Sequence, residues 1–127
     1  MDPAQALADL TEISSQIEAA VLFDETGELA GSTLADEGAA SSLARAAAEL
    51  LARADTLGRG ERTVTQVEAS SSDGSVFVVR EGSRRIAATT GPDPTVGLVF
   101  YDLKSCLRGA DEKPKRRRAA RKDDGEA

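Results

Sequence analysis

Three short strand-like runs in the second half of the chain limit its possible folds more than any other feature of the sequence. They span Arg62 to Ala69, Ser75 to Arg80, and Arg84 to Thr90. The linkers between them, Ser72-Asp73-Gly74 and Glu81-Gly82-Ser83, are short and contain glycine, as hairpin turns do. Because such turns join neighbouring antiparallel strands, the sequence predicts a three-stranded antiparallel meander.

A further pair of strands is predicted earlier in the chain. Side chains alternate with a period of two along Ile17 to Asp24, so one face of this strand is more apolar than the other. Asp24-Glu25-Thr26-Gly27 follows as a turn, in which Gly27 supplies the positive backbone φ of a tight hairpin. Residues Glu28 to Ser32 then return as the partner strand. Five antiparallel strands are therefore expected.

A long helix is predicted between the two groups of strands. Ser32 or Thr33 is expected to cap its start, and Gly58 is expected to end it. The main apolar stripe contains Leu43, Ala46, Ala47, Leu50, Ala54 and Leu57, and the narrow polar stripe contains Ser41, Arg45, Glu49 and Arg53. Most of the remaining surface is alanine, which fits either a simple alanine-rich helix or one that also packs closely on a partner.

The chain also begins with a helix signal. Asp2 precedes Pro3 in the arrangement of an N-cap followed by a proline at the first helical position, and Gln5 stands where a capping box needs it. The apolar residues that follow recur at helical spacing until the polar pair Ser14-Ser15. A short first helix is therefore predicted before the first strand.

The same signal recurs after the meander, where Asp93 precedes Pro94. Strand propensity is high in the segment Thr95 to Arg108, but its apolar residues recur at steps of three and four, which favours a helix. Gly109 is expected to end this last helix. The predicted order of elements is αββαβββα, an α+β fold.

Several kinds of chemistry lack the residues that they need. The chain has no histidine, which excludes a Ser-His-Asp or Cys-His arrangement and a histidine-containing zinc site. No Gly-x-x-x-x-Gly-Lys or Gly-x-Gly-x-x-Gly string is present to bind nucleotide phosphates. The single cysteine, Cys106, is expected to be a small core residue. We therefore expect a protein that is not an enzyme and that uses no metal or cofactor.

Charge divides the chain into two parts. Residues 1 to 112 carry 9 basic and 19 acidic residues, whereas residues 113 to 122 carry 7 basic residues and no acidic one. We expect one domain over residues 1 to 112 and a disordered tail, basic and then acidic, over residues 113 to 127. Neither a secretory signal nor an apolar run long enough to cross a membrane is visible, so a cytoplasmic location is expected.

The order of elements and three local strings resemble the Roadblock/dynein light chain family, in particular its bacterial MglB-like members. The strings are Ala20-Val-Leu-Phe-Asp-Glu-Thr-Gly27, the alanine-rich second helix, and Thr95-Val-Gly-Leu-Val-Phe-Tyr-Asp-Leu103. Together the resemblance covers roughly residues 3 to 109. It implies a Roadblock-type sandwich, in which a five-stranded antiparallel sheet has the second helix on one face and the two terminal helices on the other.

The resemblance further implies how two copies would pair. Family members associate through the third strand, which lies at a sheet edge, and through their second helices. The dimer interface expected here contains Leu43, Ala47, Leu50, Ala54, Thr63, Thr65 and Val67. Physical reasoning agrees, because an edge strand offers backbone groups for pairing and an alanine surface allows close helix packing. The chain is expected to form a homodimer, or a heterodimer with a related Roadblock subunit.

By the same resemblance, the protein is expected to be a non-catalytic dimeric regulator or scaffold of a Ras-like small GTPase. Arg45, Arg53 and Arg59 are candidate partner contacts, although exposed helix arginines are usually solvated or paired at i,i+4. Two other classes remain open. A small-molecule sensor of profilin or PAS type would need a pocket lined by convergent polar groups. A nucleic-acid or membrane adaptor would depend on the basic tail, which the acidic body makes less favourable.

Overall fold

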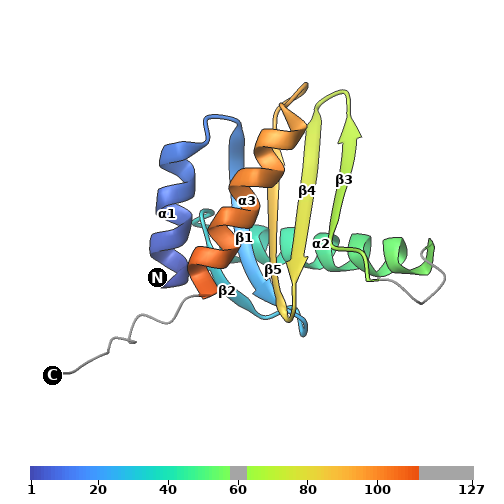
Figure 1. Cartoon of the computed structure of the whole chain (residues 1–127), viewed down its shortest axis with the longest axis horizontal. Helices are drawn as coiled ribbons and strands as arrows, with labels where there is room; N and C mark the ends of the chain where they lie inside the picture. Colours follow the sequence, from blue (N-terminus) through green and yellow to red (C-terminus); the bar gives the residue numbers. More distant parts are fainter. Residues whose placement is uncertain (58–62, 112–127) are drawn as a thin grey trace, which may run out of the picture.

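A computed structural model describes residues 1–57 and 63–111 of the chain, and its elements follow the expected order αββαβββα (Figure 1). The helices are α1 (Pro3–Ile13), α2 (Glu37–Leu57) and α3 (Val96–Asp111). The strands are β1 (Ile17–Asp24), β2 (Leu29–Ser32), β3 (Gln66–Ser71), β4 (Gly74–Glu81) and β5 (Arg84–Thr90).

All five strands form one antiparallel sheet in the order β2-β1-β5-β4-β3. Gly27 closes the β1–β2 hairpin with a φ of +88°, as the sequence predicts. Strands β3, β4 and β5 form the expected meander, and β5 also pairs with β1, which joins the two groups. The α+β fold class is thereby confirmed, with β3 at one edge of the sheet.

The two faces of the sheet are covered by different helices, as Figure 1 shows. Helices α1 and α3 pack on one face, where Leu22 and Phe77 belong to the larger core. Helix α2 packs on the other face, where Val21 and Val78 belong to the second core. Neighbouring residues of one strand thus enter opposite cores, because successive side chains of a β-strand point to opposite faces.

The stripe that helix α2 turns toward the sheet overlaps only in part with the predicted one, which it shares at Ala47. Its buried residues are Ala40, Ala44, Ala47 and Leu51, and the small alanines allow the helix to lie close to the strands. Leu43, Leu50 and Ala54 are only partly buried on one flank, and Leu57 is 83% exposed. Leu43 and Leu50 therefore pack at the margin of this core, whereas Leu57 lies outside it.

The predicted N-cap of α2 was also wrong. Asp36 caps the helix, since its side chain accepts a hydrogen bond from the Gly38 amide at 3.0 Å. The hydroxyls of Ser32 and Thr33 are used elsewhere: Ser32 accepts from the amide of Leu34 at 2.9 Å, and Thr33 accepts from the amide of Ala20 at 2.9 Å. The expected stop at Gly58 lies outside the described residues.

Helix α1 starts as expected, because Asp2 accepts a hydrogen bond from the Gln5 amide at 2.8 Å. Helix α3 departs from its prediction at both ends. Asp93 has a left-handed φ of +57°, so it belongs to the turn before the helix, which begins at Val96. Gly109 lies within α3, which continues to Asp111, so it does not end the helix as predicted.

Gly74 is the position in the meander with the least room for a side chain. A Cβ atom there would lie 2.2 Å from the backbone oxygen of Thr90, in the neighbouring strand. We expect Gly74→Ala to lower the free energy of unfolding by about 2 kcal/mol, because the strands must separate locally. Urea unfolding of the variant and the unmodified chain would measure this difference in free energy. Gly97→Ala, whose Cβ meets nothing within 4 Å, is the control, and an equal loss in both would contradict the packing argument.

Candidate interaction surface

Strand β3 leaves an open edge of the sheet. The Arg80 amide donates to the Thr65 oxygen at 2.8 Å, and Gln66 lies opposite Val79 in the register. Backbone groups of an antiparallel strand point alternately toward and away from the neighbouring strand. The N–H and C=O groups of Gln66, Glu68 and Ser70 therefore point away from β4, where another strand could pair with them.

An apolar groove adjoins this edge. It has a volume of about 470 Å³ and is lined by Leu50, Arg53, Ala54, Thr56, Leu57 and Val67. In Figure 1 the C-terminal turns of α2 extend past β3, so the helix reaches beyond the edge of its own sheet. Leu57, on the last of these turns, is the most exposed large apolar residue in the described part of the chain.

The residues expected at a dimer interface are not all placed alike. Leu50, Ala54 and Val67 line the groove together, and Leu43 is partly buried farther along α2. Thr63 and Thr65 are exposed, but they precede β3, which begins at Gln66 and ends at Ser71 rather than spanning the predicted Arg62 to Ala69. Arg62 lies outside the described residues.

Ala47 must be removed from the expected interface. Its exposure is 0%, and it packs in the core between α2 and the sheet. A side chain that is already covered within one subunit has no surface to offer to a second subunit. Three exposed residues were not singled out for this role by the sequence: Thr56 and Leu57, which line the groove, and Ala69, which lies two residues after Val67 and so on the same face of β3.

The candidate arginines differ in their surroundings. Arg53 forms an exposed i,i+4 ion pair with Glu49 at 3.2 Å, an arrangement that contributes little to stability in solvent. Arg45 is exposed on α2. Arg59 lies outside the described residues. The surface of α2 that faces solvent thus carries two of the three arginines.

Arg80 and Asp55 fix the position of Val64, just before β3. The sequence did not predict this role. The Arg80 Nη2 atom donates to Asp55 Oδ1 at 2.6 Å, and Arg80 Nε donates to the backbone oxygen of Val64 at 2.9 Å. The same Asp55 oxygen accepts a hydrogen bond from the Val64 amide at 3.1 Å. Because the two side chains are 25 residues apart in sequence, no local pattern could have revealed the contact.

The contacts of Asp55 with Arg80 and Val64 depend on pH, because they require the carboxylate to be ionised. The hydrogen bond from Arg80, followed by that from the Val64 amide, lowers the pKa of Asp55 below its ordinary value of 3.8. A carboxylate whose pKa is lower in the folded state than in the unfolded state stabilises the fold at pH values above its ordinary pKa. This contribution is lost as the pH falls through the lowered pKa.

We therefore expect the NMR signal of the Val64 amide to stay constant from about pH 7 to about pH 4 and to shift only below that range. The Asp55→Asn variant should show no such shift, because it has no carboxylate to protonate. A Val64 signal that titrates at the ordinary pKa, or that titrates equally in the variant, would contradict the assignment.

Within residues 1–57 and 63–111, no group of three or more metal-ligating side chains comes together. Over the same residues, no helix is long and apolar enough to cross a membrane. Cys106 is buried as expected, and burial raises the pKa of its thiol to about 11, so the group is neutral at physiological pH.

No protein-family model and no curated protein matches the sequence. Similar solved structures do exist. The Roadblock/LC7 domain from Streptomyces avermitilis has a TM-score of 0.77 at 18% identity, covering 86% of this chain and 94% of that one. The gliding protein MglB from Thermus thermophilus has a TM-score of 0.68 at 14% identity, covering 85% of this chain and 87% of that one.

A structure described as MglB with tetrameric arrangement is also similar, with a TM-score of 0.71 at 14% identity, covering 84% of this chain and 82% of that one. The likeness to all three structures extends over most of each chain. It is a likeness of fold, since so few of the aligned residues are identical.

Proposed function

We propose that this chain, which has the Roadblock/LC7 fold, is a non-catalytic dimeric regulator or scaffold of a Ras-like small GTPase system. The observation that carries the proposal is the open β3 edge beside the apolar groove of α2. Such a surface is built for association with another protein, because both its backbone groups and its apolar side chains remain available.

The proposed dimer joins two copies across a two-fold axis. The β3 edges would pair through the outward backbone groups of Gln66, Glu68 and Ser70, which would extend the sheet from one subunit into the other. The overhanging turns of α2 would pack against the partner, with Leu57 and Leu50 covered in the contact. The solved tetrameric arrangement of a similar MglB chain supports association as a property of this fold.

A dimer of this kind would offer the solvent side of two α2 helices as a platform. GTP hydrolysis needs the switch residues of a GTPase to be held in their reactive arrangement. A surface that binds this arrangement more tightly than the others increases its population without supplying a catalytic group. Arg45 lies on this platform as a candidate contact, and Arg53, which also lines the groove, lies where the platform meets the dimer interface. A partner that depends on GTP implies a cytoplasmic location.

The proposal is tested by binding that depends on the nucleotide. Ras-like GTPases of the source organism are purified, each loaded with GDP or with a non-hydrolysable GTP analogue, and titrated with the full chain by isothermal calorimetry. One of them should bind with at least about a tenfold preference for one nucleotide state. The chain alone should hydrolyse no GTP. Failure of every GTPase to bind in either state would contradict the proposal.

A further inference from the structure

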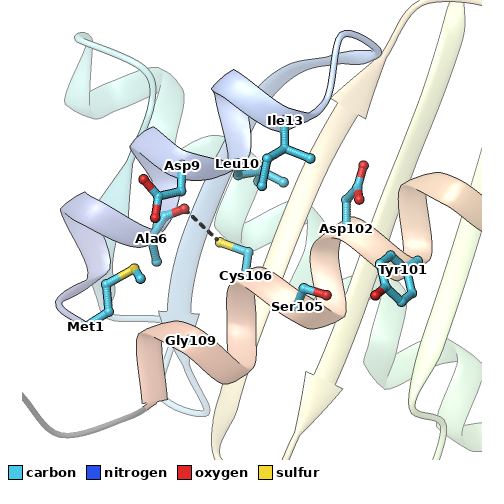
Figure 2. Close-up of a pocket in the computed structure, with 10 residues that line it drawn as sticks. All are labelled: Met1, Ala6, Asp9, Leu10, Ile13, Tyr101, Asp102, Ser105, Cys106 and Gly109. Atoms are coloured by element: carbon cyan, nitrogen blue, oxygen red, sulfur yellow. Dashed lines mark hydrogen bonds between the residues drawn. The ribbon is translucent and has the colours of Figure 1, made fainter.

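A second groove lies on the face of the sheet opposite α2, between α1 and α3 (Figure 2). Its volume is about 310 Å³. The lining residues come from both helices and from the N-terminus: Met1, Ala6, Asp9, Leu10, Ile13, Tyr101, Asp102, Ser105, Cys106 and Gly109. The lining side chains include two carboxylates, those of Asp9 and Asp102, and no lysine or arginine, and Met1 with its N-terminal ammonium group also lines the groove.

Asp102 is the unusual member of this set. It is only 8% exposed, and its side chain lines the groove from α3. Within the part of the chain that the structure describes, its carboxylate accepts no hydrogen bond and forms no ion pair. Among the fully buried polar side-chain atoms of the described residues, only Ser14 Oγ lacks a partner, so the oxygens of Asp102 reach solvent through the groove, where a ligand can bind them.

The second carboxylate lies on the opposite wall. Asp9 of α1 accepts a hydrogen bond from Gln5 Nε2 at 2.9 Å, which fixes the orientation of its side chain beside the groove. A cation that enters between the two helices would therefore meet negative charge on both sides. Because the interior of a groove has a lower effective dielectric constant than water, this attraction exceeds that of an exposed pair.

Large apolar side chains at and beside the groove remain open to solvent. Ile13 at the end of α1 is 71% exposed, and Tyr101 on α3 is 68% exposed. Leu98, one turn before Tyr101, is 49% exposed. Large apolar residues grouped on one surface usually mark a contact with another protein. Here they are joined to an acidic groove, so the ligand must carry both an apolar and a cationic group.

We propose that the α1/α3 groove binds a segment of a partner protein that carries a large apolar side chain close to a lysine or arginine. The apolar side chain lies between Ile13 and Tyr101, and the cation pairs with Asp102. The groove lies on the other face of the sheet from α2, so this is a second interaction surface and goes beyond the proposed GTPase role. The basic tail is a poorer occupant, because residues 113–127 contain no large apolar side chain.

The probe is a synthetic peptide of leucines and lysines, acetylated and amidated, with the spacing of an amphipathic helix. It is titrated into the ¹⁵N-labelled full chain and followed by NMR. We expect shift changes concentrated in α1 and α3. Asp102→Asn should weaken binding about tenfold, because it removes a charge-assisted hydrogen bond but keeps the shape of the side chain. Asp73→Asn, in the distant β3–β4 turn, should leave the affinity unchanged.

A second variant tests the groove at an exposed position, where a substitution should not disturb the fold. Ser105 is exposed and lines the groove, and Ser105→Lys would place a cation one helical turn from Asp102. It should abolish binding while the melting temperature is preserved. The proposal is overturned if Asp102→Asn binds as tightly as the unmodified chain. It is also overturned if the same peptide with glutamates in place of lysines binds equally well.

The tail is tested separately. In one further variant, glutamine replaces the seven basic residues between 113 and 122. If the groove binds the peptide only in this variant, the tail of the chain is the true occupant and the proposal of a partner segment is wrong. Equal affinity in the variant and the unmodified chain supports a partner. Each of these outcomes is independent of GTPase binding, so the two proposals fail separately.

Discussion

Replacing Ala47 with glutamate is expected to unfold the chain or to lower its free energy of unfolding by more than about 4 kcal/mol. Ala47 is 0% exposed and lies in the core with Val21 and Val78. A carboxylate there would be buried without a partner and would push α2 away from the sheet. A small domain has only about 5 to 15 kcal/mol of stability to lose. Far-ultraviolet circular dichroism with urea unfolding would measure the effect.

The neighbouring residue supplies a matched control. Ala48 is exposed on the same helix, so Ala48→Glu adds the same charge at nearly the same point in the sequence. Its effect should stay within about 0.5 kcal/mol, as for most surface substitutions. Equal losses of stability in the two variants would show that α2 does not face the sheet as described.

Phe77→Ala is expected to lower the free energy of unfolding by about 3 to 5 kcal/mol. Phe77 lies in the interior strand β4 at 0% exposure, and its ring meets that of Phe100 edge to face, with centroids 5.0 Å apart. The substitution removes this aromatic contact and leaves a cavity between the sheet and α3. Urea unfolding of the purified variant gives the value directly.

Phe77→Leu is the corresponding control, because leucine keeps most of the apolar volume. Its cost should be clearly smaller than that of alanine, since less of the cavity is created. A loss below about 1 kcal/mol for Phe77→Ala would mean that the site collapses easily or that the β4 core is not packed as described.

The strands were the part of the fold most readily predicted from the sequence. The period of two along β1 and the glycine turns at Gly27 and Gly82 act locally, so they identify strands and hairpins without knowledge of the tertiary structure. The start of β3 was wrong because Arg80 and Asp55 hold residues before Gln66 outside the strand. That contact forms only in the folded chain.

The orientation of α2 was harder to predict, for a different reason. An alanine-rich helix carries weak apolar contrast between its sides, so periodicity selected the flank with Leu43 and Leu50. The fold instead buries Ala40 and Ala44, because small residues bring the helix backbone closer to the sheet. Helix propensity therefore identified the element correctly but not the side that it buries.

The candidate surfaces also differ in how far the sequence could predict them. The sequence indicated Leu50, Ala54 and Val67, which line one groove in the structure. The α1/α3 groove escaped notice, although one signal was present: Asp102 interrupts the apolar stripe of α3 directly before Leu103. From the sequence alone, however, Asp102 fits a solvated charge on the helix surface equally well. Its burial appears only once α1 packs beside α3.

The dimer is tested most directly by the solution mass of the full chain, measured by light scattering. One chain has a mass of 13.3 kDa. We predict twice that mass for the unmodified chain and the mass of one folded chain for the double variant Leu57→Glu with Ala69→Glu. Ile13→Glu, on the opposite face, should remain a dimer. A folded monomer in the unmodified chain, or a double variant that stays dimeric, would contradict the proposed interface.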